Sequence, residues 1–161
     1  MNMQNRSSLE QAVDAKLRVM KHLPKQGDLS LIILKGHLLI EELLFALVSS
    51  AAKDPAAIKS ANLSYYGLAS VAKALFYESR VGPVWDAMFE LNKLRNTLAH
   101  NLEPPDLNEK LKRFGVVGSG GHAEAGNLVL SDPEGVMVSS IEVMCGVLIG
   151  LISSQSSEGS T

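Results

Sequence analysis

The chain has 161 residues, 46% hydrophobic and 5% aromatic, which is enough for one domain with an aliphatic core and too few for two. A formal net charge of −2 argues against a protein that coats nucleic acid by bulk charge, although it leaves room for a small basic site. The one cysteine, Cys145, excludes an internal disulfide, and the polar first 11 residues lack a secretory signal, so we expect a cytoplasmic protein.

Helix signals begin near the N-terminus. Ser7 and Ser8, followed three residues later by Glu10 and Gln11, predict a capping box that opens a first helix ending at Pro24. The next helix is predicted from Asp28 to about residue 53. It is apolar around nearly its whole circumference, which indicates a central helix covered on most sides. Its charged residues interrupt it too often for a membrane span.

The rest of the chain is also predicted to be mainly helical. Residues 115–127 hold five glycines and predict a mobile loop without the Gly-Lys-Ser/Thr ending of a phosphate-binding loop, and 128–130 predict a brief extended segment. In the last helix, Gly146 and Gly150 permit the close approach of another helix. Further helices are predicted at 55–60, from 64 to a break at 80–83, at 83–101, 106–114 and 133–152.

Together these elements predict an all-α, antiparallel helical bundle. We expect a single domain over residues 1–152, with its core at about 28–103, its C-terminal helix at 133–152 and a disordered polar tail at 153–161.

The candidate site lies near the end of the helix predicted at 83–101. Asn92, Asn96 and His100 recur every four residues and form one polar stripe, with Arg95 at its edge. A guanidinium presents a planar fork to phosphate oxygens, and an imidazole moves protons near neutral pH. In RNA the ribose 2′-OH is an internal nucleophile, so Arg95 and His100 can suffice without a metal. The same pair near a helix C-terminus can instead complement the helix dipole and satisfy carbonyls.

Other polar residues have two interpretations. Glu41, one helical turn after His37, is a candidate to pair with Arg95 and fix its rotamer, or to form a polar pair in the core or an interface. For His37 we favour a structural role. The spacing of these residues is not that of a zinc protease, and neither a metal site nor a cofactor is predicted.

Further residues have simpler expected roles. Cys145, on an apolar helix face, is expected to be a buried small hydrophobe. Tyr65 and Tyr66 can stack on bases, but packing is the default expectation. A basic rim near the motif is suggested by Lys93, Lys110, Lys112 and Arg113, each of which is also explained by a solvated helix face.

Arg95 and Asn96, followed by three residues and His100 on a long helix, resemble the motif of the HEPN superfamily. That motif is an arginine, usually a polar residue, and a histidine after four to six intervening positions. The acidic central helix around Glu41 also resembles the second helix of a bacterial branch of these domains. The resemblance covers roughly residues 28–103.

The resemblance implies an HEPN-like fold and a metal-independent endoribonuclease, often the toxin of a toxin–antitoxin or phage-defence system. It implies a homodimer in which two motifs face each other across a cleft, with RNA as substrate and an antitoxin protein as a possible partner. Arg95 would hold the scissile phosphate, Asn96 would orient it and His100 would transfer protons, with Glu41 and Asn92 in support.

One HEPN branch has a tyrosine two positions after the histidine, which a nucleotidyltransferase antitoxin modifies. Leu102 occupies that position here, so this form of regulation is not expected. The alternative function is a non-catalytic helical interaction module, either an adaptor or a transcriptional regulator.

Overall fold

The structure is a computed structural model that describes residues 8–158, and all regular structure in this range is helical. The prediction of an all-α protein is confirmed. In chain order the elements are α1 (Ser8–His22), α2 (Leu29–Ala51), α3 (Pro55–Ser60), α4 (Tyr65–Phe76), the 3-10 turn η2 (Ser79–Val81), α5 (Gly82–His100), α6 (Leu107–Gly118), α7 (Ala123–Ser131) and α8 (Pro133–Glu158).

Capping side chains set the start of three helices. The Asp28 carboxylate accepts hydrogen bonds from two backbone N–H groups in the first turn of α2, and Asp54 does the same for α3. The Ser64 hydroxyl oxygen accepts one from the Gly67 N–H in α4. These interactions satisfy N–H groups that a helix leaves unpaired, so the predicted starts are confirmed. The capping box predicted at Ser7 involves a residue outside the described range.

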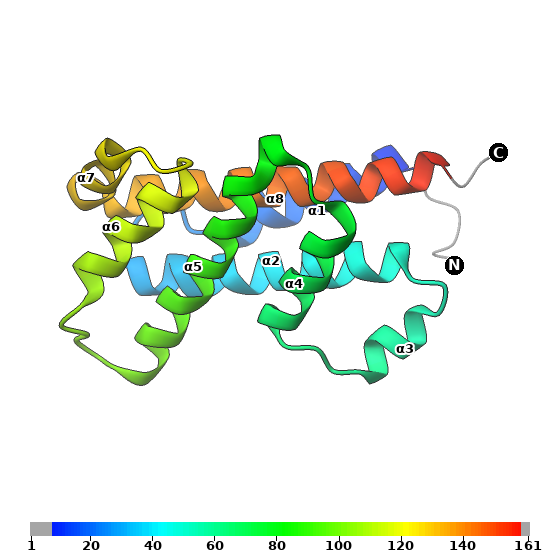
Figure 1. The fold of residues 1–161 in the computed structure, drawn as a ribbon, viewed down its shortest axis with the longest axis horizontal. Helices are drawn as coiled ribbons and strands as arrows, with labels where there is room; N and C mark the ends of the chain where they lie inside the picture. The colour runs from blue at the N-terminus through cyan, green and yellow to red at the C-terminus, as the bar shows by residue number, and fades with distance from the viewer. Residues whose placement is uncertain (1–7, 159–161) are drawn as a thin grey trace.

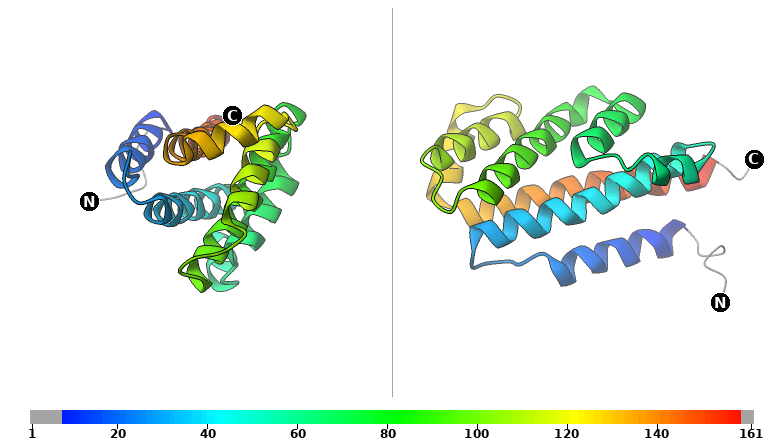
Figure 2. Two further views of the ribbon diagram at one scale, coloured as in Figure 1. Left: turned by 90° about the vertical axis from the view of Figure 1, so that its left-hand side faces the viewer. Right: turned by 90° about the horizontal axis from the view of Figure 1, so that it is seen from below.

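The helices form two layers (Figures 1 and 2). In one layer α2 and α8 lie side by side, and α1 packs along α8. In the other, the hairpin of α4 and α5 crosses α2, while α6 and α7 pack together at one end. The predicted antiparallel order holds for α1 against α8 but not for α2 and α8, which run in the same direction (Figure 1). The segment between them returns the chain to the end at which α2 begins, so α8 starts beside the start of α2.

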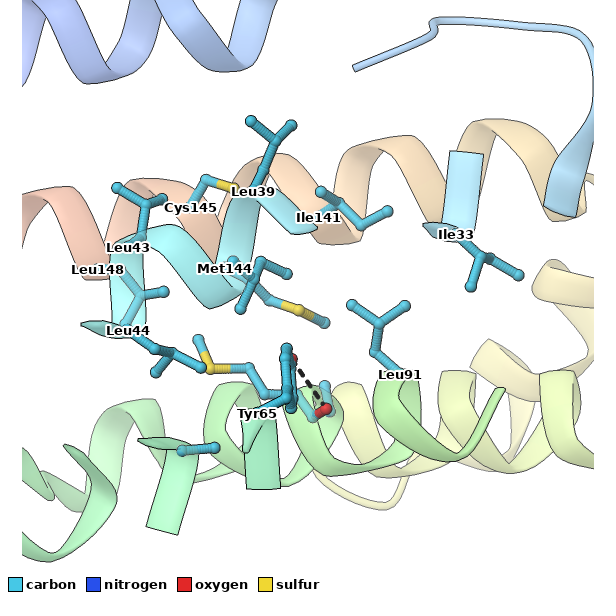
Figure 3. Close-up of a cluster of buried hydrophobic side chains, with 14 of the residues drawn as sticks. Ile33, Leu39, Leu43, Leu44, Tyr65, Leu91, Ile141, Met144, Cys145 and Leu148 are labelled. Atoms are coloured by element: carbon cyan, nitrogen blue, oxygen red, sulfur yellow. Dashed lines mark hydrogen bonds between the residues drawn. The ribbon is translucent and has the colours of Figure 1, made fainter. Parts of the chain in front are cut away.

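The core lies between the layers and is mainly aliphatic, as the composition predicts. Figure 3 shows side chains of α2 and α8, among them Leu44, Ile141 and Met144, meeting those of α4 and α5. Tyr65 is buried here, and its hydroxyl donates a hydrogen bond to the Met88 carbonyl oxygen at 3.1 Å. This bond satisfies the polar end of an otherwise apolar side chain.

The prediction of a loop over residues 115–127 is wrong for most of this range. Because α6 continues to Gly118 and α7 begins at Ala123, only residues 119–122 form a loop. The prediction of an extended segment at 128–130 is also wrong, because these residues lie within α7. Two of the glycines serve helix packing. A Cβ on Gly115 would lie 2.5 Å from Val129 Cγ2, and one on Gly126 would lie 2.7 Å from Lys112 Cγ, so these glycines let α6 and α7 approach closely.

The last helix is longer than predicted. Residues 153–158 are helical as the end of α8, where the sequence predicted a disordered tail. Residues 133–155, which contain an 18-residue window with a mean hydropathy of 2.1, form the one described helix long and apolar enough to cross a membrane. Length and composition alone give this result, which a core helix of a soluble protein also gives. In this fold α8 packs against α1 and α2.

Candidate functional site

Helix α5 carries the candidate residues and is anchored by its apolar face. Pro83 lies in its first turn, where a proline needs no intrahelical partner, and the Asn101 backbone N–H bonds to the Thr97 carbonyl oxygen at its end. The C-terminal end of α5 projects past α2 (Figures 1 and 2). The buried face that holds the helix in place comprises Trp85, Met88, Leu91 and Leu94.

Arg95 turns toward α2 and is partly buried. It lines a pocket of about 160 Å³, together with Leu34 of α2 and Ala99 of its own helix. Its Nη1 donates a hydrogen bond to Asn96 Oδ1 at 3.1 Å, whereas its Nε is buried and has no hydrogen-bond partner in the described chain. An arginine held by one amide and left with unused donors can accept an anion without losing an ion pair.

His100 lies in the last turn of α5 and is exposed. Within residues 8–158 no hydrogen bond joins it to Arg95. Five residues of helix place the two side chains about 140° apart around the axis, with Asn96 between them. A ligand touching both must therefore bind over the exposed end of the helix.

Asn92 lies one turn before Asn96 and faces the interior of the bundle. Its Oδ1 accepts a 3.0 Å hydrogen bond from His37 Nε2. The His37 ring is 4% exposed and stacks on Tyr65, with ring centroids 4.0 Å apart and an interplanar angle of 18°. Burial lowers the pKa of His37, helped by the Arg95 charge and opposed by the Asn92 hydrogen bond and the Glu41 charge. His37 is therefore a neutral, packed residue that orients Asn92.

Glu41 is partly buried, one turn from His37. It makes no ion pair with Arg95 within residues 8–158, so the suggested Glu41–Arg95 pair does not form here. Its charge acts on His37 and Tyr65 instead.

Cationic side chains gather along the seam between α5 and α6. Lys93 Nζ lies 2.7 Å and Arg113 Nε 3.1 Å from the same oxygen of Glu90, a residue that is only 6% exposed. Lys110 donates to Thr97 Oγ1 at 2.8 Å and pairs with Asp106. Two cations share one buried carboxylate, which leaves an excess of positive charge beside the middle of α5. Lys112, the fourth residue of the predicted rim, instead packs its stem beside α7.

Sequence reasoning missed the central role of Glu90. The only local signal is its position three residues before Lys93, which permits an ion pair on one helix. Its contact with Arg113 spans 23 residues and depends on how α5 and α6 pack.

A groove of about 620 Å³ lies between α1 and α8, apart from the pocket of Arg95, which faces α2. Its floor includes Gly146 and Gly150, where an added Cβ would meet no atom within 4 Å, and its wall includes Val13 and Met20. Cys145 also lines it, and burial raises the pKa of this thiol to about 12, so the thiol is protonated and not a nucleophile at neutral pH.

No group of three or more His, Cys, Asp or Glu side chains is placed to hold a metal ion within residues 8–158. Of the predicted site residues, the structure joins Arg95 to Asn96, turns Asn92 toward His37 and leaves His100 exposed beyond them. The chain matches no protein-family model, no curated protein and no solved structure.

Proposed function

We propose that this protein is a metal-independent endoribonuclease of HEPN type, acting in the cytoplasm as the toxin of a toxin–antitoxin or phage-defence system. The observation that carries the proposal is the 3.1 Å bond between Arg95 Nη1 and Asn96 Oδ1, at a projecting helix end where His100 is exposed. A phosphate over this end can meet a guanidinium, an amide and an imidazole together.

The proposed reaction uses the RNA's own 2′-OH. The 2′-oxygen attacks the adjacent phosphorus while His100, in its neutral form, accepts the hydroxyl proton. The bond from phosphorus to the 5′-oxygen breaks, and that oxygen takes a proton back from the imidazolium or from water. Arg95 binds the phosphate oxygens on which charge develops, and Asn96 holds the guanidinium in place. The products are a 2′,3′-cyclic phosphate and a 5′-hydroxyl.

The positive seam between α5 and α6 supports a polyanionic substrate. Lys93 and Arg113 are each more than half exposed although both contact Glu90, so their remaining donors face solvent. An RNA strand that displaces counterions from such groups gains affinity, which weakens as salt rises.

An apolar stripe on α2 supports the proposed homodimer. The stripe consists of Leu31, Leu34, Leu38 and Phe45, which are 38–48% exposed. Leu34 also lines the pocket beside Arg95. A second copy covering this stripe would bring a second motif near the first, as the proposed dimeric cleft requires.

Purified protein incubated with total RNA in EDTA tests the proposal. Wild type should cleave the RNA, and His100→Ala should not, with its fold unchanged by circular dichroism. Overexpression should slow cell growth for wild type but not for His100→Ala. Intact RNA with the wild-type protein would exclude the nuclease.

The groove between α1 and α8 favours a second candidate, a non-catalytic interaction module. Its glycine floor and apolar wall fit a partner helix, as does the exposed stripe of Leu9, Val13, Leu17 and Met20 on α1. This candidate predicts that His100→Ala leaves growth and RNA unaffected, whereas Gly146→Leu, which fills the groove, abolishes its cellular effect.

A further inference from the structure

Two neighbouring tyrosines in α4 have opposite environments. Tyr65 is buried against His37, whereas Tyr66 is 61% exposed. Tyr66 contacts the ring of Phe89 on α5, with centroids 5.3 Å apart and an interplanar angle of 55°. This tilted pair leaves much of the Tyr66 ring open to solvent at the seam of α4 and α5.

The aromatic pair lies on the same face of α5 as Asn96 and His100, whereas Arg95 faces α2. Phe89, Lys93, Asn96 and His100 follow one another at steps of four, three and four residues, which places them on one side of a helix. At the helical rise, Phe89 and His100 are about 16 Å apart along the axis. The face therefore runs from an aromatic platform, past a cation, to the proposed phosphate-binding end.

Positive charge lies along this face. Lys73 Nζ lies 5.6 Å from the Phe89 ring centroid, and its charge is balanced by Asp86 at 2.7 Å. Lys93 lies one turn beyond Phe89 and shares Glu90 with Arg113, so this part of the face has more cations than carboxylates. Aromatic rings beside exposed cations are the features that bind single strands, through base stacking and phosphate contacts.

We infer that the face from Tyr66 to His100 is a binding track for single-stranded RNA, in which one base stacks on Tyr66 and Lys93 contacts a backbone phosphate. This inference rests on the proposed function and extends it by naming residues outside the motif that bind the strand. A duplex does not fit the track, because the faces of its bases are covered by their neighbours. The track also determines which nucleotide lies at the cleaved phosphate, because it holds the strand at a point about 16 Å from His100 along the helix axis.

Fluorescence anisotropy with a labelled, 2′-O-methylated single-stranded RNA tests the inference. The 2′-O-methyl group removes the nucleophile, so binding is measured without cleavage. Tyr66→Ala should weaken binding about 10-fold, the loss expected for one stacked base. Tyr66→Phe, which keeps the ring, should bind like wild type. The control is Leu75→Ala, a residue of similar exposure (57%) near the other end of α4, which should also bind like wild type.

Two results overturn the track: undiminished binding by Tyr66→Ala, or an equal loss for Tyr66→Ala and Leu75→Ala. Failure of the wild-type protein to bind the RNA also overturns it. Cleavage of unmodified RNA by wild type, measured in parallel, keeps the two proposals apart. Cleavage without Tyr66-dependent binding would contradict only the proposed binding track. Tyr66-dependent binding without cleavage would contradict only the proposed nuclease activity.

Discussion

His37 of α2 and Asn92 of α5 are joined by a 3.0 Å hydrogen bond across 55 residues of sequence. Because Asn92 Oδ1 only accepts, His37 Nε2 carries the proton. The other ring nitrogen, Nδ1, is buried without a partner in the described chain. This bond ties the helix that carries the candidate site to the central helix of the bundle.

The lowered pKa of His37 predicts a pH-dependent stability. Below about pH 6.5, the ordinary pKa of histidine, the unfolded chain protonates this side chain while the folded ring remains neutral. The free energy of unfolding should therefore fall as the pH drops below that value. Urea unfolding of wild type and His37→Gln at several pH values measures this dependence, because a glutamine amide can keep the bond to Asn92 without titrating. The same pH dependence in both proteins would contradict this account.

Alanine substitutions at glycines on different helices should change the stability of the protein in opposite directions. In Gly115→Ala the new Cβ would lie 2.6 Å from the Ala125 backbone oxygen, so the protein should lose about 1–3 kcal/mol of stability through overpacking. Gly146→Ala faces open space in α8 and should gain up to about 1 kcal/mol from helix propensity. Urea midpoints of the two variants check both signs, and a stabilised Gly115→Ala would show that α6 and α7 are not closely packed.

Replacing Glu90 should lower the free energy of unfolding more than replacing an ordinary surface carboxylate does. Glu90→Ala removes the shared partner of Lys93 and Arg113 and should cost about 1–3 kcal/mol, toward the lower end because both cations can turn to water. Glu109→Ala, on the exposed face of α6, is the control and should change stability by less than about 0.5 kcal/mol. Equal effects of the two substitutions in thermal unfolding would argue against the bridge between α5 and α6.

A charge introduced into the apolar stripe on α2 should disrupt the proposed dimer. Leu38→Glu should convert a dimer to a monomer in sedimentation and lower the rate of RNA cleavage with it, because a buried unpaired carboxylate is costly. Leu75→Glu makes the same change at an exposed leucine of α4, away from the stripe, and should leave both properties unchanged. Dimerisation unaffected by Leu38→Glu would place the interface elsewhere.

The sequence predicts the helices well where local chemistry decides. The caps at Asp28, Asp54 and Ser64 act within three residues, so their effect can be read from the chain alone. The glycines of 115–127 misled the prediction because Gly115 and Gly126 serve a contact between two helices, which local propensity does not contain. For the same reason the parallel order of α2 and α8 escaped prediction.

The sequence predicts only those features of the candidate site that lie within one helix. Arg95, Asn96 and His100 follow from their spacing on α5, but the partners of that helix do not. Asn92 meets His37, and Glu90 meets Arg113, through packing between helices. These contacts depend on helix orientation and registry, and neither is encoded in a short motif.

The initial rate of cleavage of a single-stranded RNA in EDTA tests the central claim most directly, with wild type, Arg95→Ala and His100→Ala compared at equal concentration. The account predicts cleavage by wild type and a loss of at least about 100-fold in each variant, since one removes phosphate binding and the other proton transfer. Cleavage that persists in both variants, or an RNA that wild type leaves intact, would contradict it.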